Sequence, residues 1–239
     1  MKVLALDSSG LVASCALLED DRLLAEYTVD YKKTHSQTLL PMVDEICRMT
    51  ETDPAEIGAV AIAGGPGSFT GLRIGAATAK GLGLALQVPV IPVPTVDAMA
   101  YGLWGASGLV CPMMDARRNQ VYTGFYRFAD GAMEVVREQW AEDVEELARQ
   151  LNEMGEPVTF LGDGVPVYRK KLDALLTVPA QYAPLHLSRQ RAASVGALAM
   201  TYPAERAVSA DAFRPIYLRK SQAEREREAG IHTKGSMYD

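Results

Sequence analysis

The sequence has little cysteine and histidine, and it lacks the short signatures of common hydrolases. Its three histidines are isolated from one another, and no HExxH, GxSxG or Cys–His pattern occurs. The three cysteines, Cys15, Cys47 and Cys111, are widely spaced among apolar residues. Their odd number and spacing favour neither a disulfide framework nor a Cys-x-x-Cys metal site. We therefore expect a protein of the reducing cytoplasm.

Long hydrophobic runs and an excess of positive charge are also absent. No apolar stretch approaches the roughly 18 residues of a membrane span, and the apolar run at residues 1–7 is too short for a secretory signal. We expect a soluble chain without membrane contact. With 24 basic and 30 acidic residues, the net charge is -6, which argues against a strong nucleic-acid footprint. Any contact with RNA is expected to run through partner proteins.

The first part of the chain predicts a meander followed by crossover units. At 239 residues and 48% apolar content, the chain can form one large or two small domains. Strand-like runs at residues 3–7, 11–18 and 22–27 are separated by turn residues and predict three antiparallel strands. A helix at 36–49, a strand at 58–63, a helix ending near residue 86 and a strand at 88–93 follow. This order favours parallel pairing through a right-handed crossover.

The pattern restarts near residue 105. Strands at 109–114, 120–128 and 133–138, a helix at 141–154 and a strand at 158–161 predict a second meander with its own crossover. We predict an α/β protein of two related halves, residues 1–104 and 105–220, in which a helix at 188–203 is a candidate to pack back on the first half. The charged tail at 221–239 has little to bury and is predicted to be disordered.

Two turns could hold a ligand. Residues 64–75 read Gly-Gly-Pro-Gly-Ser-Phe-Thr-Gly-Leu-Arg-Ile-Gly and connect a buried strand to a helix. Glycines allow close backbone approach and helix amides attract anions, but the Walker ending and the dinucleotide spacing are missing. Phosphate contact and a tight turn both remain open here. The same choice, ligand or capped turn, applies to Asp7, Ser8 and Ser9, where a strand ends.

Two helices carry an unusual amount of small or apolar surface. Gly71, Gly75, Ala79 and Gly83 recur every four residues and would let another helix approach closely, although each interior glycine costs about 1 kcal/mol relative to alanine. The preceding helix has a broad apolar surface. Internal packing and a subunit interface both remain open, and the candidate interface residues are Leu39, Leu40, Val43, Ile46, Cys47, Gly71, Leu72, Gly75, Ala76, Ala79 and Gly83.

Four segments taken together resemble the TsaB family, also called YeaZ. They are residues 5–9 (Ala-Leu-Asp-Ser-Ser), 35–41 (His-Ser-Gln-Thr-Leu-Leu-Pro), 65–75 (the glycine segment) and 114–118 (Met-Asp-Ala-Arg-Arg). The resemblance implies the actin-like ATPase superfold and a non-catalytic scaffold subunit for bacterial synthesis of tRNA threonylcarbamoyladenosine (t6A). It implies as partners the transferase TsaD, which modifies the adenosine next to the anticodon, and the ATPase TsaE. It also implies a homodimer when the chain is alone, and tRNA reached indirectly through the complex.

The resemblance also implies what the chain lacks. TsaD-like proteins carry a His-x-x-x-His metal pair after a strand, and the matching positions here are Thr95 and Met99. Hydroxyl and thioether groups are poor ligands for iron or zinc, so no metal site is expected. No cofactor is expected to be required. Weak ATP or ADP binding is left open at a vestigial site made of Asp7, Ser8, Ser9, Gly65, Gly67, Ser68, Gly162 and Gly164.

Two other functions remain open. A small actin-like ATPase or kinase would use Asp7 with a second carboxylate as base, for which Asp97, Asp115 and Asp163 are candidates. ATP turnover by the isolated chain would reveal it. A metallopeptidase of the glycoprotease type would need the metal pair that Thr95 and Met99 replace, and metal analysis would identify it.

Overall fold

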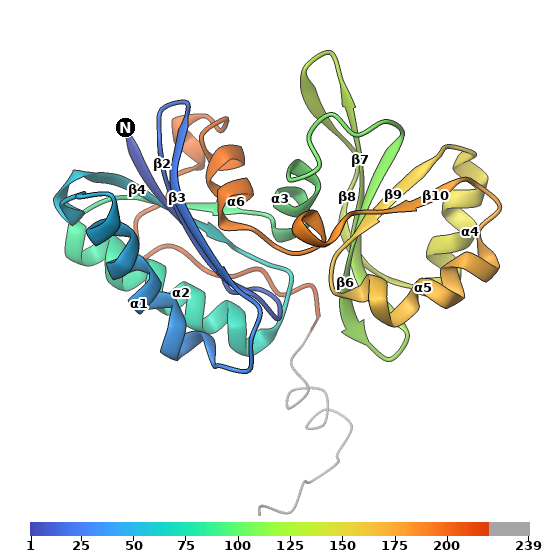
Figure 1. Cartoon of the computed structure of the whole chain (residues 1–239), viewed down its shortest axis with the longest axis horizontal. Coiled ribbons are helices and arrows are strands. Elements are labelled where there is room, and N and C mark those ends of the chain that lie inside the picture. Colours follow the sequence, from blue (N-terminus) through green and yellow to red (C-terminus); the bar gives the residue numbers. More distant parts are fainter. Residues whose placement is uncertain (220–239) are drawn as a thin grey trace, which may run out of the picture.

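The computed structural model describes residues 1–219 and contains two five-stranded sheets side by side (Figure 1). The strands of the first sheet are β1 (Lys2–Asp7), β2 (Ala13–Glu19), β3 (Arg22–Val29), β4 (Ile57–Ala63) and β5 (Val90–Val93), in the order β3-β2-β1-β4-β5. The first three pair antiparallel, as the short turns between them require. β4 lies parallel to β1, and β5 lies parallel to β4.

The second sheet repeats this plan. It consists of β6 (Leu109–Arg117), β7 (Gln120–Ala129), β8 (Ala132–Asp143), β9 (Val158–Leu161) and β10 (Ala180–Tyr182), in the order β10-β9-β6-β7-β8. Again three strands form an antiparallel meander and two are parallel. Two copies of one topology confirm the predicted α/β class with two related halves. β8 continues to Asp143, so the helix expected from residue 141 begins later.

Helices cover both faces of the first sheet. Side chains alternate along β1. Leu4 and Leu6 join the core under α1 (His35–Met49) and α2 (Phe69–Leu86), and Val3 and Ala5 join the core under α6 (Ala192–Ala199). A Cβ added to Gly196 of α6 would lie 2.3 Å from Leu18 Cδ1, so this helix needs a residue without a side chain there. The short helix α3 (Thr95–Tyr101) also packs against α6.

After the second sheet the chain returns to the first half, and a longer segment packs there than the sequence predicted. Helix α6 begins at Ala192 rather than at residue 188, because the backbone at Arg191 is extended and its guanidinium pairs with Glu26 of β3. Val208 pairs with Val90 of β5, and Phe213 is buried in the first core. Residues 192–216 therefore pack with the first half: the helix does so as expected, whereas the assignment of residues 204–216 to the second half at 105–220 is corrected. The predicted disorder at 221–239 lies outside the described residues.

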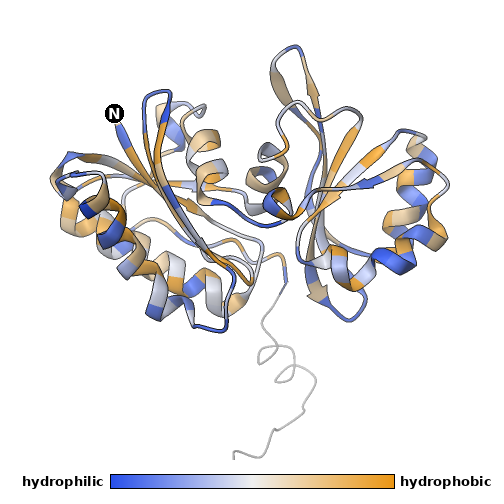
Figure 2. Ribbon diagram, in the orientation of Figure 1, coloured by the Kyte–Doolittle hydropathy of each residue, from blue (hydrophilic) through white to orange (hydrophobic). Residues whose placement is uncertain are grey.

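Helices α4 (Val144–Met154) and α5 (Gly164–Leu175) cover the second sheet. Three short 3₁₀ helices complete the structure, at Pro54–Glu56, Leu185–Leu187 and Ala204–Arg206. Hydrophobic colour follows the strands and α6, whereas α4 and α5 carry hydrophilic stretches (Figure 2). Within residues 1–219, no helix combines the length and apolar character needed to cross a membrane.

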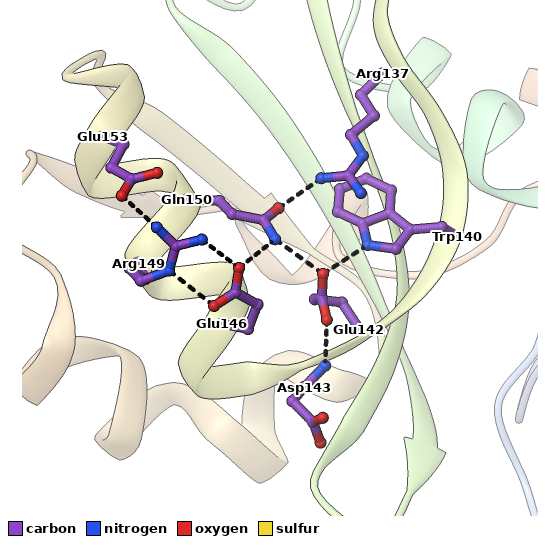
Figure 3. A network of polar contacts seen from close by, with 8 residues as sticks. All are labelled: Arg137, Trp140, Glu142, Asp143, Glu146, Arg149, Gln150 and Glu153. Carbon is purple, nitrogen blue, oxygen red and sulfur yellow. Dashed lines mark hydrogen bonds and ion pairs between the residues drawn. The ribbon is translucent and has the colours of Figure 1, made fainter.

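A network of hydrogen bonds and ion pairs connects side chains of β8 with side chains of α4 (Figure 3). The Arg137 guanidinium lies 3.6 Å from the centre of the Trp140 ring and donates a 2.6 Å hydrogen bond to Gln150. Gln150 in turn donates to Glu142 at 2.9 Å. The guanidinium groups of Arg137 and Arg149 bond to partners inside the network, which stabilises this corner. Its other members are Asp143, Glu146, Arg149 and Glu153.

Candidate functional site

Turns from the two halves meet at a cavity of about 340 Å³. It lies beyond the carboxyl ends of β1 and β6, the edge at which open α/β sheets usually bind ligands. Three of the eight predicted nucleotide-site residues, Ser9, Gly67 and Ser68, line it. Asp7, Ser8, Gly65, Gly162 and Gly164 do not reach its surface. Residues that sequence reasoning did not place there include Gly10, Leu11, Met114, Tyr122 and Val167.

The glycine segment packs tightly on the turn that follows β1. A Cβ on Gly67 would lie 2.2 Å from the Ser9 carbonyl oxygen, so only glycine fits. The Ser68 amide donates to that carbonyl at 2.6 Å, and the Ser8 hydroxyl donates to the Gly71 carbonyl at 2.9 Å. These groups satisfy one another inside the protein. This geometry favours the tight-turn interpretation over a phosphate loop with free amides.

Asp7 is buried at the floor of this region. One carboxylate oxygen, Oδ1, accepts hydrogen bonds from the Ser9 amide at 2.9 Å and the Ser9 hydroxyl at 2.7 Å. The other, Oδ2, has no hydrogen-bond partner among the described residues. Burial raises the Asp7 pKa to about 6, because desolvation of the charge outweighs the two bonds from Ser9 and the nearby His35.

Two further polar side chains lie at the same turn, one partly buried and one fully buried. His35, the first residue of α1, contacts the Gly10 carbonyl through Nε2 at 2.9 Å, and its Nδ1 has no partner within residues 1–219. The Gln190 side chain is fully buried against Gly10, and both of its amide atoms lack partners there. The sequence contained no signal for Gln190, because it reaches the turn only when the chain returns to the first half.

Replacing Asp7 with asparagine should stabilise the protein in a pH-dependent way. With a pKa of about 6 in the fold and 3.8 as its ordinary value, the folded state binds the proton more tightly than the unfolded chain. The wild-type free energy of unfolding therefore falls as pH rises from about 4 to about 6. We expect Asp7→Asn to gain about 3 kcal/mol at pH 8 and almost nothing at pH 3.5. Urea unfolding at both pH values measures this, and a pH-independent gain would contradict it.

The second half contributes two carboxylates to the cavity. Asp163 accepts a 3.0 Å hydrogen bond from the Asp115 amide, and burial raises its pKa. A Cβ on Gly162 would lie 2.1 Å from the Met113 carbonyl oxygen, so this turn also requires glycine. Asp97, the third candidate base, does not line the cavity and accepts a 2.7 Å hydrogen bond from Tyr126. Asp115 and Asp163 are therefore the only two of the three that face the cavity.

The two positions matched to the metal pair serve packing. The Thr95 hydroxyl accepts a 3.1 Å hydrogen bond from the Gly65 amide, and Thr95 is fully buried. Met99 is 3% exposed and belongs to the core between α3 and the second sheet. Among residues 1–219, no group of three or more histidine, cysteine, aspartate or glutamate side chains is placed to hold a metal ion.

The predicted interface stripe turns inward. A Cβ on Gly71 would lie 2.1 Å from the Ser8 carbonyl oxygen, one on Gly75 would lie 2.3 Å from Ser8 Oγ, and one on Gly83 would lie 2.9 Å from Ala210 Cβ. The helix needs small residues because it lies on its own sheet and loops, so the assignment of this stripe to a subunit interface is corrected. The residues thus assigned to the protein's own core are Leu39, Ile46, Gly71, Leu72, Gly75, Ala76, Ala79 and Gly83. Val43 and Cys47 are also buried, at 6% and 7% exposed, but they line the groove between the two helices.

The opposite surface of the same helices is exposed and apolar. Leu40, the one exposed member of the predicted set, is 55% exposed, as is Leu84, and Met49 is 61% exposed. Gly81 faces open space, with no atom within 4 Å of an added Cβ. Between α1 and α2 lies a groove of about 530 Å³. We call this surface the α1–α2 outer face; the groove is lined by Leu40, Pro41, Val43, Asp44, Cys47, Pro54, Ile57, Leu82 and Leu86.

Two solved structures from Pseudomonas aeruginosa have this fold. One, described as YeaZ, is 29% identical with a TM-score of 0.76 and covers 91% of this chain and 99% of its own. The other, described as an uncharacterized protein with similarity to peptidase YEAZ, is 30% identical with a TM-score of 0.77 at the same coverage.

Sequence comparisons agree with the structural ones. The family model of TsaD, tRNA N6-adenosine threonylcarbamoyltransferase, matches residues 22–227. The tRNA threonylcarbamoyladenosine biosynthesis protein TsaB of Bacillus subtilis (strain 168) is 34% identical over 176 residues, which are 74% of this chain and 77% of the relative. TsaB of Haemophilus influenzae is 32% identical over 235 residues, which are 92% of this chain and 94% of the relative. The chain therefore belongs to the TsaB (YeaZ) family.

Proposed function

We propose that this chain is a non-catalytic subunit in the synthesis of tRNA threonylcarbamoyladenosine in the cytoplasm. Relatives that match most of this chain carry the name of that biosynthesis. The observation that carries the non-catalytic role is the packing of Thr95 and Met99, where TsaD-like proteins place metal ligands. Thr95 bonds the glycine segment and Met99 fills a core. Both side chains are buried in contacts of their own, and neither a hydroxyl nor a thioether is a good ligand for iron or zinc.

The proposed partner is the transferase TsaD, and the proposed contact is the α1–α2 outer face. Exposed leucine and methionine side chains, a flat stretch at Gly81 and the groove between the helices form a surface on which another helix pair can pack. Because TsaD resembles this chain, a similar pair of helices is expected to meet it there. In the absence of TsaD the same face would form a two-fold homodimer. The complex of this chain with TsaD would then recruit TsaE.

No cofactor is required in this proposal. Weak binding of ATP or ADP is proposed at the cavity between the halves, with Ser9, Gly67 and Ser68 as contacts. The facing carboxylates Asp115 and Asp163 are the one feature that favours the alternative, a small ATPase or kinase. Measurable ATP turnover by the isolated chain would support that alternative.

The association itself is the experiment that tests the proposed role. The chain is mixed with the TsaD of the same organism, and the molar mass is measured after size separation, with each protein alone as the control. We expect a stable heterodimer to replace the homodimer of this chain. Separate, unchanged masses at micromolar concentration would contradict the proposal.

A further inference from the structure

A segment near the end of the described chain bridges the two halves, and on the second half it contacts Ala116, which lines the cavity. The Ile216 amide donates to the Gly64 carbonyl at 2.7 Å. A few residues later, the Arg219 guanidinium donates to the Ala116 carbonyl of β6 at 3.0 Å. Residues 214–219, which we call the strap, thus run from the glycine segment to the second half (Figure 1).

Two partly exposed aromatic rings meet where the strap passes the start of α2. Tyr217 is 42% exposed, and its ring centre lies 5.0 Å from that of Phe69, which begins α2 and is 37% exposed. The Arg73 guanidinium lies 5.3 Å from the centre of the Phe69 ring. A partly exposed ring pair held in place by a cation is suited to stacking against another flat group.

Positive charge gathers beside these rings. Arg117 and Arg118 occupy the turn after β6 with left-handed φ values of 65° and 55°, and both are exposed. Within residues 1–219, Arg73, Arg118 and Arg219 form no ion pair with a carboxylate, and the Arg117 side chain is 83% exposed although it reaches Asp115 at 3.3 Å. Most other arginines are neutralised by carboxylates: Arg48, Arg127, Arg149, Arg169, Arg189 and Arg191.

We propose that this surface binds RNA directly, at a loop or strand that offers an unstacked base. Planar guanidinium groups pair well with phosphate oxygens, and exposed rings stack on unpaired bases. This deepens the proposed function, because it gives the chain its own contact with the tRNA. The surface consists of Phe69, Arg73, Arg117, Arg118, Tyr217 and Arg219.

An acidic protein segment is the competing occupant. Ile216 and Leu218 of the strap are 47% and 38% exposed and would suit such a partner. Arginines pair with carboxylates as well as with phosphates, but the partly exposed ring pair of Phe69 and Tyr217 suits a flat base, which an acidic segment does not offer. The observations therefore favour RNA.

The test measures the affinity of the full chain, alone and bound to TsaD, for an unmodified tRNA transcript and for a blunt RNA duplex of equal length. We expect Tyr217→Ala to weaken tRNA binding about tenfold and to leave duplex binding unchanged, because only the tRNA offers unstacked bases. Arg117→Asn/Arg118→Asn keeps a residue type that tolerates the left-handed backbone. The slope of log affinity against log salt concentration measures how many phosphates are neutralised. In this double variant the slope should become shallower by about 0.7 for each phosphate that an arginine no longer contacts.

The matched control, Arg22→Ala/Arg206→Ala, removes two exposed arginines that form no ion pair within residues 1–219 from other surfaces, and it should bind tRNA as the wild type does. Three results would overturn the inference: an equal loss of tRNA binding in this control, wild-type tRNA binding by both Tyr217→Ala and Arg117→Asn/Arg118→Asn, or binding of an acidic peptide without any binding of tRNA. TsaD association is measured on the same variants and should be unchanged. A further outcome is that TsaD does not bind the wild-type chain while Tyr217→Ala and Arg117→Asn/Arg118→Asn still weaken tRNA binding. In that case the proposed function fails and the RNA surface stands.

Discussion

Replacing Gly71 with alanine is expected to lower the free energy of unfolding by about 3 kcal/mol. The new Cβ would lie 2.1 Å from the Ser8 carbonyl oxygen, and that carbonyl belongs to a buried turn that cannot move away. In an exposed helix the same change stabilises by about 1 kcal/mol. The sign of the effect therefore reports whether this face of α2 is buried inside the protein. Urea unfolding monitored by circular dichroism measures it.

Gly81 provides the matched control on the same helix. An added Cβ would meet no atom within 4 Å, so Gly81→Ala should raise the free energy of unfolding by about 1 kcal/mol. Opposite signs for the two variants would show that α2 has one packed and one open face. If Gly71→Ala stabilised the protein as Gly81→Ala does, the close contact with the turn after β1 would be wrong.

Charging the α1–α2 outer face is expected to break the association with TsaD. Leu40 and Leu84 are each 55% exposed, so Leu40→Asp/Leu84→Asp should change the midpoint of unfolding very little. In the proposed complex both carboxylates would be buried without partners. Truncation of single hot-spot residues costs about 2 kcal/mol or more, so we expect the double variant to bind TsaD at least 100-fold more weakly.

Leu185→Asp is the control for the outer-face variant. Leu185 is 94% exposed on a different surface, before α6, and its replacement adds the same kind of charge without touching α1 or α2. It should bind TsaD with wild-type affinity. Unchanged affinity of the Leu40→Asp/Leu84→Asp variant would remove the outer face from the account, and equal losses in both proteins would point to a non-specific effect.

The topology could be predicted because its signals are local. The turn residues between β1, β2 and β3 announce a meander, and a strand, loop, helix and strand in sequence impose parallel pairing between β4 and β5. The restart near residue 105 then repeats the same signals. The helix limits were less accurate, because β8 extends through residues whose composition suits a helix.

The side on which α2 meets its neighbours could not be predicted. A stripe of small residues indicates that some neighbour packs closely against the helix, here at Gly71, Gly75, Ala79 and Gly83. The periodicity does not say whether that neighbour is another subunit or the protein's own turn. The true outer face shows a weaker pattern, with Gly81 and Leu84 among polar and alanine residues. For the same reason Gln190 could not be placed at the turn after β1, since a contact between distant residues leaves no local trace.

The most direct test of the account is the rate of threonylcarbamoyl transfer to an unmodified tRNA by TsaD and TsaE, with and without this chain. We predict that the wild-type chain restores modification, that the chain alone produces none, and that the Leu40→Asp/Leu84→Asp variant fails to restore it while remaining folded. Full modification by TsaD and TsaE without this chain, or full rescue by the outer-face variant, would contradict the account.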